Sequence, residues 1–105
     1  MELSGSQRTY LRGLAHALRP VVQVGREGLS EGVMAAFEAA LQAHELVKVQ
    51  FLTERDRGTK RQLADAMASG AGAVCVGKIG HTAIFFRRHP DPQRRRVVLP
   101  GEETP

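Results

Sequence analysis

Two short loops bounded by glycine are the features of this 105-residue sequence best suited to contact a charged ligand. The first is Gly25-Arg26-Glu27-Gly28, and the second is Gly77-Lys78-Ile79-Gly80. A loop with glycine at both ends lets its backbone approach a phosphate chain closely, because no Cβ blocks the way. An internal basic residue adds charge, and a following helix N-terminus adds N–H donors and the positive end of the helix dipole. We expect a following helix only for the first tetrad, and a plain structural turn is the alternative for either.

No arrangement of residues predicts catalysis. The four histidines, at positions 16, 44, 81 and 89, lie in separate segments without metal-ligand spacing, so we expect surface or packing roles for them. The sequence contains no Gly-x-Ser-x-Gly elbow, no phosphate-loop motif and no dinucleotide-binding glycine pattern. Cys75 stands between two valines, which predicts a buried thiol rather than a disulfide or a metal ligand. We therefore expect a protein that is not an enzyme and takes no cofactor, metal or small-molecule substrate.

The charge is distributed unevenly along the chain. There are 15 Lys and Arg against 11 Asp and Glu, for a formal net charge of +4. Residues 27–45 contain four glutamates and no Lys or Arg, so this stretch carries −4 and the rest of the chain carries +8. Twelve of the basic residues are arginine, the side chain that suits bidentate phosphate contacts. This segregation favours an anionic partner for part of the surface.

The length and composition limit the class of protein. The length fits one domain, which we expect over residues 1–100, followed by a frayed tail over 101–105. The hydrophobic fraction of 42% is too high for a disordered chain, and no apolar stretch approaches the roughly 20 residues that span a bilayer. No pattern of a secretory signal opens the sequence. We expect a cytoplasmic monomer with no membrane partner.

The hydrophobic pattern predicts the element order α-β-α-β-α-β-β. The first helix has Ser4 as its N-cap and ends at Pro20, the second follows Ser30, and the third runs from about Thr59 to Ser69 before Gly70. Strands are expected over 20–24, 46–52, 73–76 and 82–88, with 97–99 as a candidate edge strand. The second strand alternates, which places Val47, Val49 and Phe51 on one side. The fold class is therefore α/β, a compact domain with a four-stranded mixed sheet and three helices long enough to cover one face.

Charged residues form several groups on these elements. At helical spacing, the first helix has a basic stripe apart from its leucines, and the second has an acidic stripe. Two further basic clusters lie in the loop before the third helix and beyond the last strand, and a solvated surface is the alternative for each cluster. The basic stripe contains Arg8, Arg12, His16 and Arg19; the acidic stripe Glu31, Glu38 and Glu45; the two clusters Arg55, Arg57, Lys60 and Arg61, and then Arg87, Arg88 and Arg94 to Arg96.

The run from Leu11 to Val33 closely resembles a known family. It contains Leu18-Arg19-Pro20-Val21-Val22-Gln23-Val24-Gly25 and Gly28-Leu29-Ser30, and it resembles the bacterial YhbY-like proteins of the CRM domain family (chloroplast RNA splicing and ribosome maturation). The segment 43–49 and the strand from Gly77-Lys78 to Phe86-Arg87 resemble the same family, so the resemblance covers about residues 3–100.

The resemblance implies a compact α/β RNA-binding domain, similar in fold to the C-terminal domain of translation initiation factor 3. It also implies association with precursors of the large ribosomal subunit. The family's Gly-x-x-Gly loop, similar to that of KH domains, maps onto residues 25–28, and KH-type loops clamp the backbone of a few nucleotides. Glu27 departs from the small, polar or basic residue that is usual there.

Charge and resemblance together predict an RNA-binding protein that assists assembly of the large ribosomal subunit by binding its ribosomal RNA precursor. Aromatic residues are few, although Phe85 and Phe86 must face opposite sides of their strand and one could be exposed for stacking. We therefore expect recognition of RNA backbone and shape. The alternative is a protein-interaction module whose acidic stripe docks a basic ribosomal protein. The expected RNA-binding residues are Gly25, Arg26, Glu27, Gly28, Arg8, Arg12, Arg19, Lys48, Arg55, Arg57, Lys60, Arg61, Lys78, Arg87 and Arg88.

Overall fold

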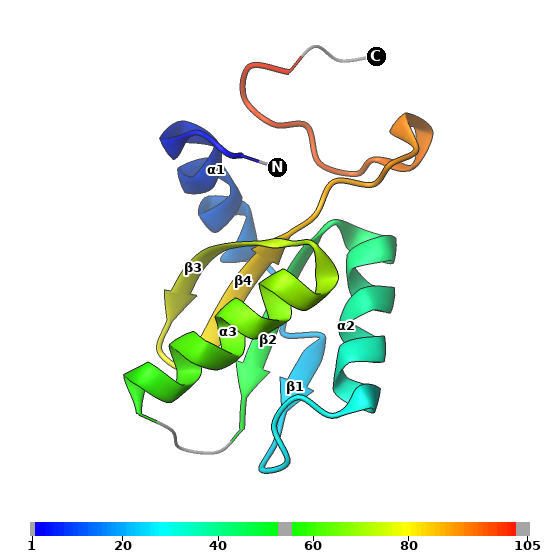
Figure 1. Ribbon diagram of the computed structural model, residues 1–105. Helices are drawn as coiled ribbons and strands as arrows, with labels where there is room; N and C mark the ends of the chain where they lie inside the picture. The colour runs from blue at the N-terminus through cyan, green and yellow to red at the C-terminus, as the bar shows by residue number, and fades with distance from the viewer. Residues whose placement is uncertain (1, 53–55, 103–105) are drawn as a thin grey trace.

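The computed structural model describes residues 2–52 and 56–102, and over these residues it has three α-helices and four strands in the predicted order (Figure 1). The sheet order is β1-β2-β4-β3, with β1 parallel to β2 and the other two pairings antiparallel, which confirms the α/β class and the mixed sheet. A short 3-10 helix, η1, follows the last strand. The elements are α1 Gly5–Ala15, β1 Val22–Val24, α2 Glu31–His44, β2 Leu46–Phe51, α3 Arg57–Ala71, β3 Val74–Ile79, β4 Thr82–Phe86 and η1 Pro92–Arg94.

Two helices begin where the sequence predicts. The Ser4 hydroxyl accepts the N–H of Gln7 at 3.1 Å, and the Gln7 side chain accepts the N–H of Ser4 at 3.0 Å. The hydroxyl of Ser30 accepts the N–H of Val33 at 3.2 Å at the start of α2. Both serines satisfy N–H groups that have no partner inside the helix, which confirms their role as N-caps.

The third helix is longer than predicted. Asp56 is its N-cap and accepts the N–H of Thr59 at 2.7 Å, so α3 begins two residues before the predicted start. It continues through Gly70 and ends at Gly72, whose φ of 65° lies in the left-handed region that glycine adopts readily. The stop signal is the second of two nearby glycines.

The first helix is shorter than predicted. It ends at Ala15, well before Pro20, and the chain then forms tight turns in which residues 16–18 bond to carbonyls three residues back. Arg19 therefore lies outside the helix, and the predicted stripe of basic residues is wrong beyond Arg8 and Arg12.

The face of the sheet that packs against α2 and α3 holds the larger core. Val47, Val49 and Phe51 of β2 alternate into this core, as predicted. Phe85 of β4 lies between the strands and α2, where its ring meets that of Phe37 edge to face at a centroid distance of 4.8 Å. Phe37 and Leu41 thus form the buried part of α2.

The opposite face of the sheet is covered as well, so the expectation that the helices cover a single face is wrong. Leu11 and Ala15 of α1 pack with Ile84 and Phe86 of β4 and with Leu99. Because alternate residues of β4 enter the two cores, Phe85 and Phe86 are both fully buried, and neither is exposed for stacking. The helices cover two faces because α1 precedes β1 and lies across β3 and β2 rather than beside α2.

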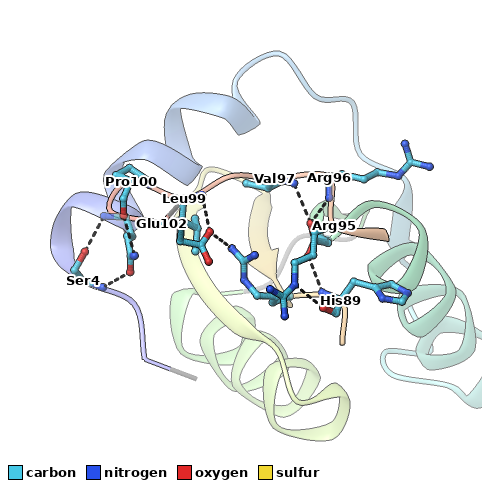
Figure 2. A network of polar contacts seen from close by, with 11 residues as sticks. Ser4, His89, Arg95, Arg96, Val97, Leu99, Pro100 and Glu102 are labelled. Carbon is cyan, nitrogen blue, oxygen red and sulfur yellow. Dashed lines mark hydrogen bonds and ion pairs between the residues drawn. The ribbon is translucent and has the colours of Figure 1, made fainter. Parts of the chain in front are cut away.

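The C-terminal segment crosses this second face without forming the predicted edge strand over 97–99 (Figure 2). Its N–H groups bond instead to the carboxylate of Glu45, which accepts those of His89 and Arg96 at 2.6 Å and that of Val97 at 2.9 Å. Glu45 is only 1% exposed. A side-chain carboxylate thus takes the place of a neighbouring strand.

The segment expected to be a frayed tail is held to the domain as far as Glu102. The carboxylate of Glu102 pairs with Arg88 and accepts the N–H of Leu99, and the Gln7 side chain donates to the carbonyl of Pro100 (Figure 2). Residues 103–105 lie outside the described residues.

None of the helices that the structure describes is long and apolar enough to cross a membrane. Within the same residues, no three His, Cys, Asp or Glu side chains gather closely enough to hold a metal ion. Cys75 is partly buried on β3, and its burial raises the pKa of the thiol, so the group stays protonated at neutral pH.

Candidate nucleic-acid interface

The fold gathers the loop after β1, the start of α3 and the β3–β4 turn at one end of the sheet, the lower end in Figure 1. β1 and β2 run parallel, so the loops that follow them leave from the same edge, and the N–H of Leu52 bonds to the carbonyl of Val24 at 2.9 Å. The hairpin turn between β3 and β4 reaches this edge too, because the N–H of Phe51 bonds to the carbonyl of His81 at 2.8 Å. We call this end the basic pole and define it as residues 25–28, 57–61 and 78–82.

The Gly25–Gly28 loop is a tight turn directly before α2. The N–H of Gly28 bonds to the carbonyl of Gly25 at 3.1 Å, and Gly28 has a φ of 71°, a left-handed conformation that favours glycine. Arg26 and Glu27 between them are exposed. A Cβ built at Gly25 would meet no atom within 4 Å, so this glycine leaves open space beside the backbone. The loop therefore has the accessible backbone and adjacent helix N-terminus that suit a phosphate chain.

A hollow of about 520 Å³ lies at the same end of the sheet as this loop, between the start of α3 and the β3–β4 turn. No acidic side chain of the described residues lines it. Its lining consists of Phe51, Arg57, Lys60, Arg61, Lys78, Gly80, His81 and Thr82. Four cationic side chains from two elements thus surround one concave surface, the arrangement expected for an anionic ligand.

One side-chain contact lies in the hollow, and a helix cap lies next to it. Lys60 Nζ lies 2.7 Å from His81 Nδ1, which links the first turn of α3 to the β3–β4 turn. Asp56 stands at the helix start, and its hydrogen bond from the N–H of Thr59 lowers the pKa of its carboxyl. Asp56 is therefore a fixed negative charge next to the cations.

The structure unites residues that the sequence placed in separate groups. Arg57, Lys60 and Arg61 of the second basic cluster meet Lys78, and all four lie at the same end as the Gly25–Gly28 loop. Arg55 lies outside the described residues. The sequence predicts only a surface or packing role for His81, and a turn between antiparallel strands next to β2 is the signal that could have placed it here.

Arg8 and Arg12 do not form an exposed stripe. They lie across the outer edge of β3, where Arg8 donates to the carbonyl of Cys75 at 3.3 Å and Arg12 to that of Val76 at 2.9 Å. A Cβ at Gly77 would come within 2.8 Å of the Arg12 side chain, so the absence of a side chain there makes room for this contact. The two guanidinium groups satisfy carbonyls of an edge strand, which has no neighbour on that side.

Arg87 and Arg88 lie at the other end of β4 and are engaged within the chain. Arg87 pairs with Glu38 and donates to the carbonyl of Ala71 at 2.9 Å. The hydrogen bond between the Arg87 and Glu38 side chains lowers the pKa of the Glu38 carboxyl and raises the pKa of Arg87. Arg88 pairs with Glu102 and lies over the ring of Phe86 at 5.7 Å. Arg88 thus holds the C-terminal part of the chain, whereas Arg87 joins the end of β4 to α2 and to the end of α3.

Arg19 and Lys48 are also separate from the basic pole. Both line a second hollow, on the face of the sheet covered by α1. Lys48 pairs across the sheet with Ile84, whose side chain enters the smaller core, which places Lys48 on that face.

The predicted acidic stripe of the second helix does not form, because Glu45 lies outside the helix. Glu45 lies beyond the end of α2 with its backbone at a φ of 63°, and its carboxylate is buried against main-chain N–H groups. Glu38 is paired with Arg87, so only Glu31 of the three is exposed without such a contact among the described ion pairs and hydrogen bonds. This arrangement removes the surface on which docking of a basic ribosomal protein depended.

Comparison with known proteins places this geometry in a family. Residues 3–87 match the CRS1 / YhbY (CRM) domain. A Haemophilus influenzae protein named "RNA-binding protein" is 45% identical over 93% of this chain and 95% of its own length. A Bacillus subtilis protein named "Probable RNA-binding protein YqeI" is 32% identical over 93% of this chain and 99% of its own length.

A solved structure agrees with these matches. The solution structure of a Staphylococcus aureus protein, described as a candidate RNA-binding protein, is similar with a TM-score of 0.77 at 28% identity. The similarity covers 92% of this chain and 100% of that one. The sequence matches and the shared fold both span almost the whole chain, and the chain belongs to the CRS1 / YhbY (CRM) domain family.

Proposed function

We propose that this protein binds RNA through its basic pole and assists assembly of the large ribosomal subunit by binding the ribosomal RNA precursor. The observation that carries the proposal is the convergence of Arg57, Lys60, Arg61 and Lys78 around one hollow, at the end of the sheet where the Gly25–Gly28 loop also lies. The names of the related proteins support RNA as the ligand. We expect the protein to act as a monomer in the cytoplasm.

The geometry favours recognition of the RNA backbone. Glycine residues let phosphates approach the main chain, the N-terminus of α2 offers N–H donors, and the cations of the hollow neutralise phosphate charge. The pole contains no Phe, Tyr or Trp on which bases could stack, and Phe51, which lines the hollow, is buried. Affinity should therefore depend strongly on salt and weakly on base sequence.

The direct test reverses charge at the hollow. Lys60→Glu and Lys78→Glu should each weaken binding to a fluorescent fragment of large-subunit ribosomal RNA, by about tenfold at low salt. The slope of log affinity against log salt should also become shallower by roughly 0.7 to 0.9 for each phosphate that the variant no longer neutralises. Arg94→Glu is the matched control, because Arg94 is exposed on η1 at the opposite end of the strands. Equal affinity of all three variants would refute the pole as the RNA site.

The cellular role requires a second measurement. In cells that lack the protein, sucrose gradients should show precursors of the large subunit, and the wild-type chain should clear them. The Lys60→Glu/Lys78→Glu chain should fail to clear them while Arg94→Glu succeeds. If RNA binding is lost in vitro but both chains clear the precursors, the protein binds RNA without acting in this assembly.

A further inference from the structure

A second hollow, of about 390 Å³, lies on the face of the sheet that α1 covers, and the proposed RNA site does not use it. We call it the apolar groove and define it by the residues that line it. One side is formed by the end of α1 and the chain that leads to β1, and the other by the junction of α2 with β2 and by the C-terminal segment. The lining is Leu14, Leu18, Arg19 and Val21 on one side, and His44, Leu46, Lys48 and Val97 on the other.

Large aliphatic side chains of the apolar groove are in contact with solvent. Leu14 is 39% exposed, Leu18 38% and Val21 54%. All three line the same hollow, so this exposed apolar surface is gathered in one place rather than scattered. Contiguous apolar surface of this kind marks interaction sites on soluble proteins, whereas single exposed leucines do not.

The early end of α1 explains why these leucines have no internal partner. Leu11 and Ala15 already supply the contact of α1 with the sheet, and both are fully buried. After Ala15 the tight turns place Leu18 beside Leu14 at the groove instead of extending the helix toward Pro20. The smaller core is complete without these two leucines.

The charges around the groove are of one sign. Arg19 and Lys48 line it, and no acidic side chain of the described residues does. Glu45 lies between the lining residues His44 and Leu46 in the sequence, but its carboxylate oxygens accept hydrogen bonds from main-chain N–H groups. Figure 2 shows the side chain of Arg96, next to the lining residue Val97, pointing away from that polar network.

We propose that the apolar groove binds an amphipathic segment of a partner protein, with aliphatic or aromatic side chains in the groove and carboxylates beside Arg19 and Lys48. Charge complementarity selects an acidic segment, and the aliphatic lining selects side chains that bury apolar surface. The groove has no glycine loop before a helix, the feature that distinguishes the basic pole. The same protein can therefore hold RNA at one end and a protein segment on the α1 face.

The probe is a synthetic amphipathic peptide of about two heptads with leucines on one face and glutamates at the flanking positions. It is titrated into the full ¹⁵N-labelled chain, and the amide shifts are recorded. The largest shifts should map to the amides of residues 18, 19, 21, 48 and 97. A peptide with lysine in place of every glutamate should bind about tenfold more weakly, because it meets Arg19 and Lys48 with like charge.

Two variants make the test specific. Val21→Asp should weaken binding of the glutamate peptide by about tenfold or more, because the substitution removes an apolar contact and adds a charge that repels the glutamates. Val98→Asp is the matched control, since Val98 is 49% exposed but does not line the groove, and it should bind as the wild type does. Amide spectra show whether each variant is folded, and Arg19→Glu provides a second substitution in the groove should Val21→Asp unfold.

Three outcomes would overturn the proposal. The glutamate peptide leaves residues 18–21 unshifted, or both peptides bind equally well, or an RNA oligonucleotide shifts these amides more than the peptide does. The last outcome would assign the groove to RNA. Lys60→Glu should leave peptide binding unchanged, so failure of the groove and failure of the basic pole give different results.

Discussion

The main-chain N–H of Arg96 donates to the carboxylate of Glu45 across 2.6 Å, which joins the C-terminal segment to the turn between α2 and β2. The same carboxylate accepts two further N–H groups and is shielded from solvent. Three N–H donors around one buried carboxylate are a strong, charge-assisted arrangement. This contact, rather than strand pairing, closes the face of the sheet beneath α1.

Glu45→Gln should therefore destabilise the protein by about 1–3 kcal/mol, because the amide directs an N–H group at one of three donors and leaves it without an acceptor. Urea denaturation measures the free energy of unfolding. Amide exchange should accelerate at His89, Arg96 and Val97. Asp65→Asn, on the exposed side of α3, is the control and should change stability by less than about 0.5 kcal/mol. Unchanged exchange at residues 96 and 97 would contradict the assigned role.

The Glu38–Arg87 pair predicts a pH dependence of stability. The pKa of Glu38 is lowered in the folded protein, so its contribution is fully present above the usual value of 4.5 and is lost as the pH falls through the lowered pKa. The difference in unfolding free energy between the wild type and Glu38→Gln should then be largest near neutral pH and shrink below 4.5.

The size of this difference should be about 0.2–1 kcal/mol, because the Glu38 side chain is more than half exposed and solvent screens the pair. Denaturation curves of the two proteins over a pH series provide the measurement. Salt at about 1 M should reduce the difference at neutral pH. A difference that grows as the pH falls would have the wrong sign for this pair.

The two glycines of the Gly25–Gly28 loop should respond differently to substitution. Gly28→Ala should destabilise the protein by about 1–2 kcal/mol, because its φ of 71° is unfavourable for a residue with a Cβ. Gly25→Ala should leave stability unchanged, since nothing lies within 4 Å of the added Cβ. It should nevertheless weaken RNA binding if phosphates pass close to Gly25. Urea denaturation and fluorescence anisotropy separate the two effects, and wild-type RNA affinity of Gly25→Ala would place the phosphates elsewhere.

Removing negative charge from the basic pole should strengthen RNA binding. Glu27→Gln, and Asp56→Ser, which keeps a helix-capping hydroxyl, should each raise affinity at low salt by about two- to fivefold. The gain should fade at high salt. Anisotropy titrations with a ribosomal RNA fragment provide the measurement. Glu2→Gln, exposed near the N-terminus at the other end of the molecule, is the control, and an equal gain there would mean that only net charge matters.

The sequence alone determined the local structure and the family. Ser4 and Ser30 cap helices because their hydroxyls satisfy N–H groups of the next turn, a relation that needs only neighbouring residues. The alternation of Val47, Val49 and Phe51 identified both the strand and its buried side. The glycine tetrad and its flanking residues identified the family, since that motif is contiguous in the chain.

Only the tertiary structure decided which charges are available to a ligand. The sequence presents three basic residues as equally good candidates for RNA contact: Arg8, Arg87 and Lys78. In the structure, Arg8 bonds to a carbonyl of β3 and Arg87 pairs with Glu38, whereas Lys78 lines the hollow of the basic pole. Periodicity assigns a residue to a face of its own helix or strand, but what covers that face depends on segments distant in the chain. Glu45 shows the same limit, because the N–H groups that bury its carboxylate come from residues 44 to 52 positions away.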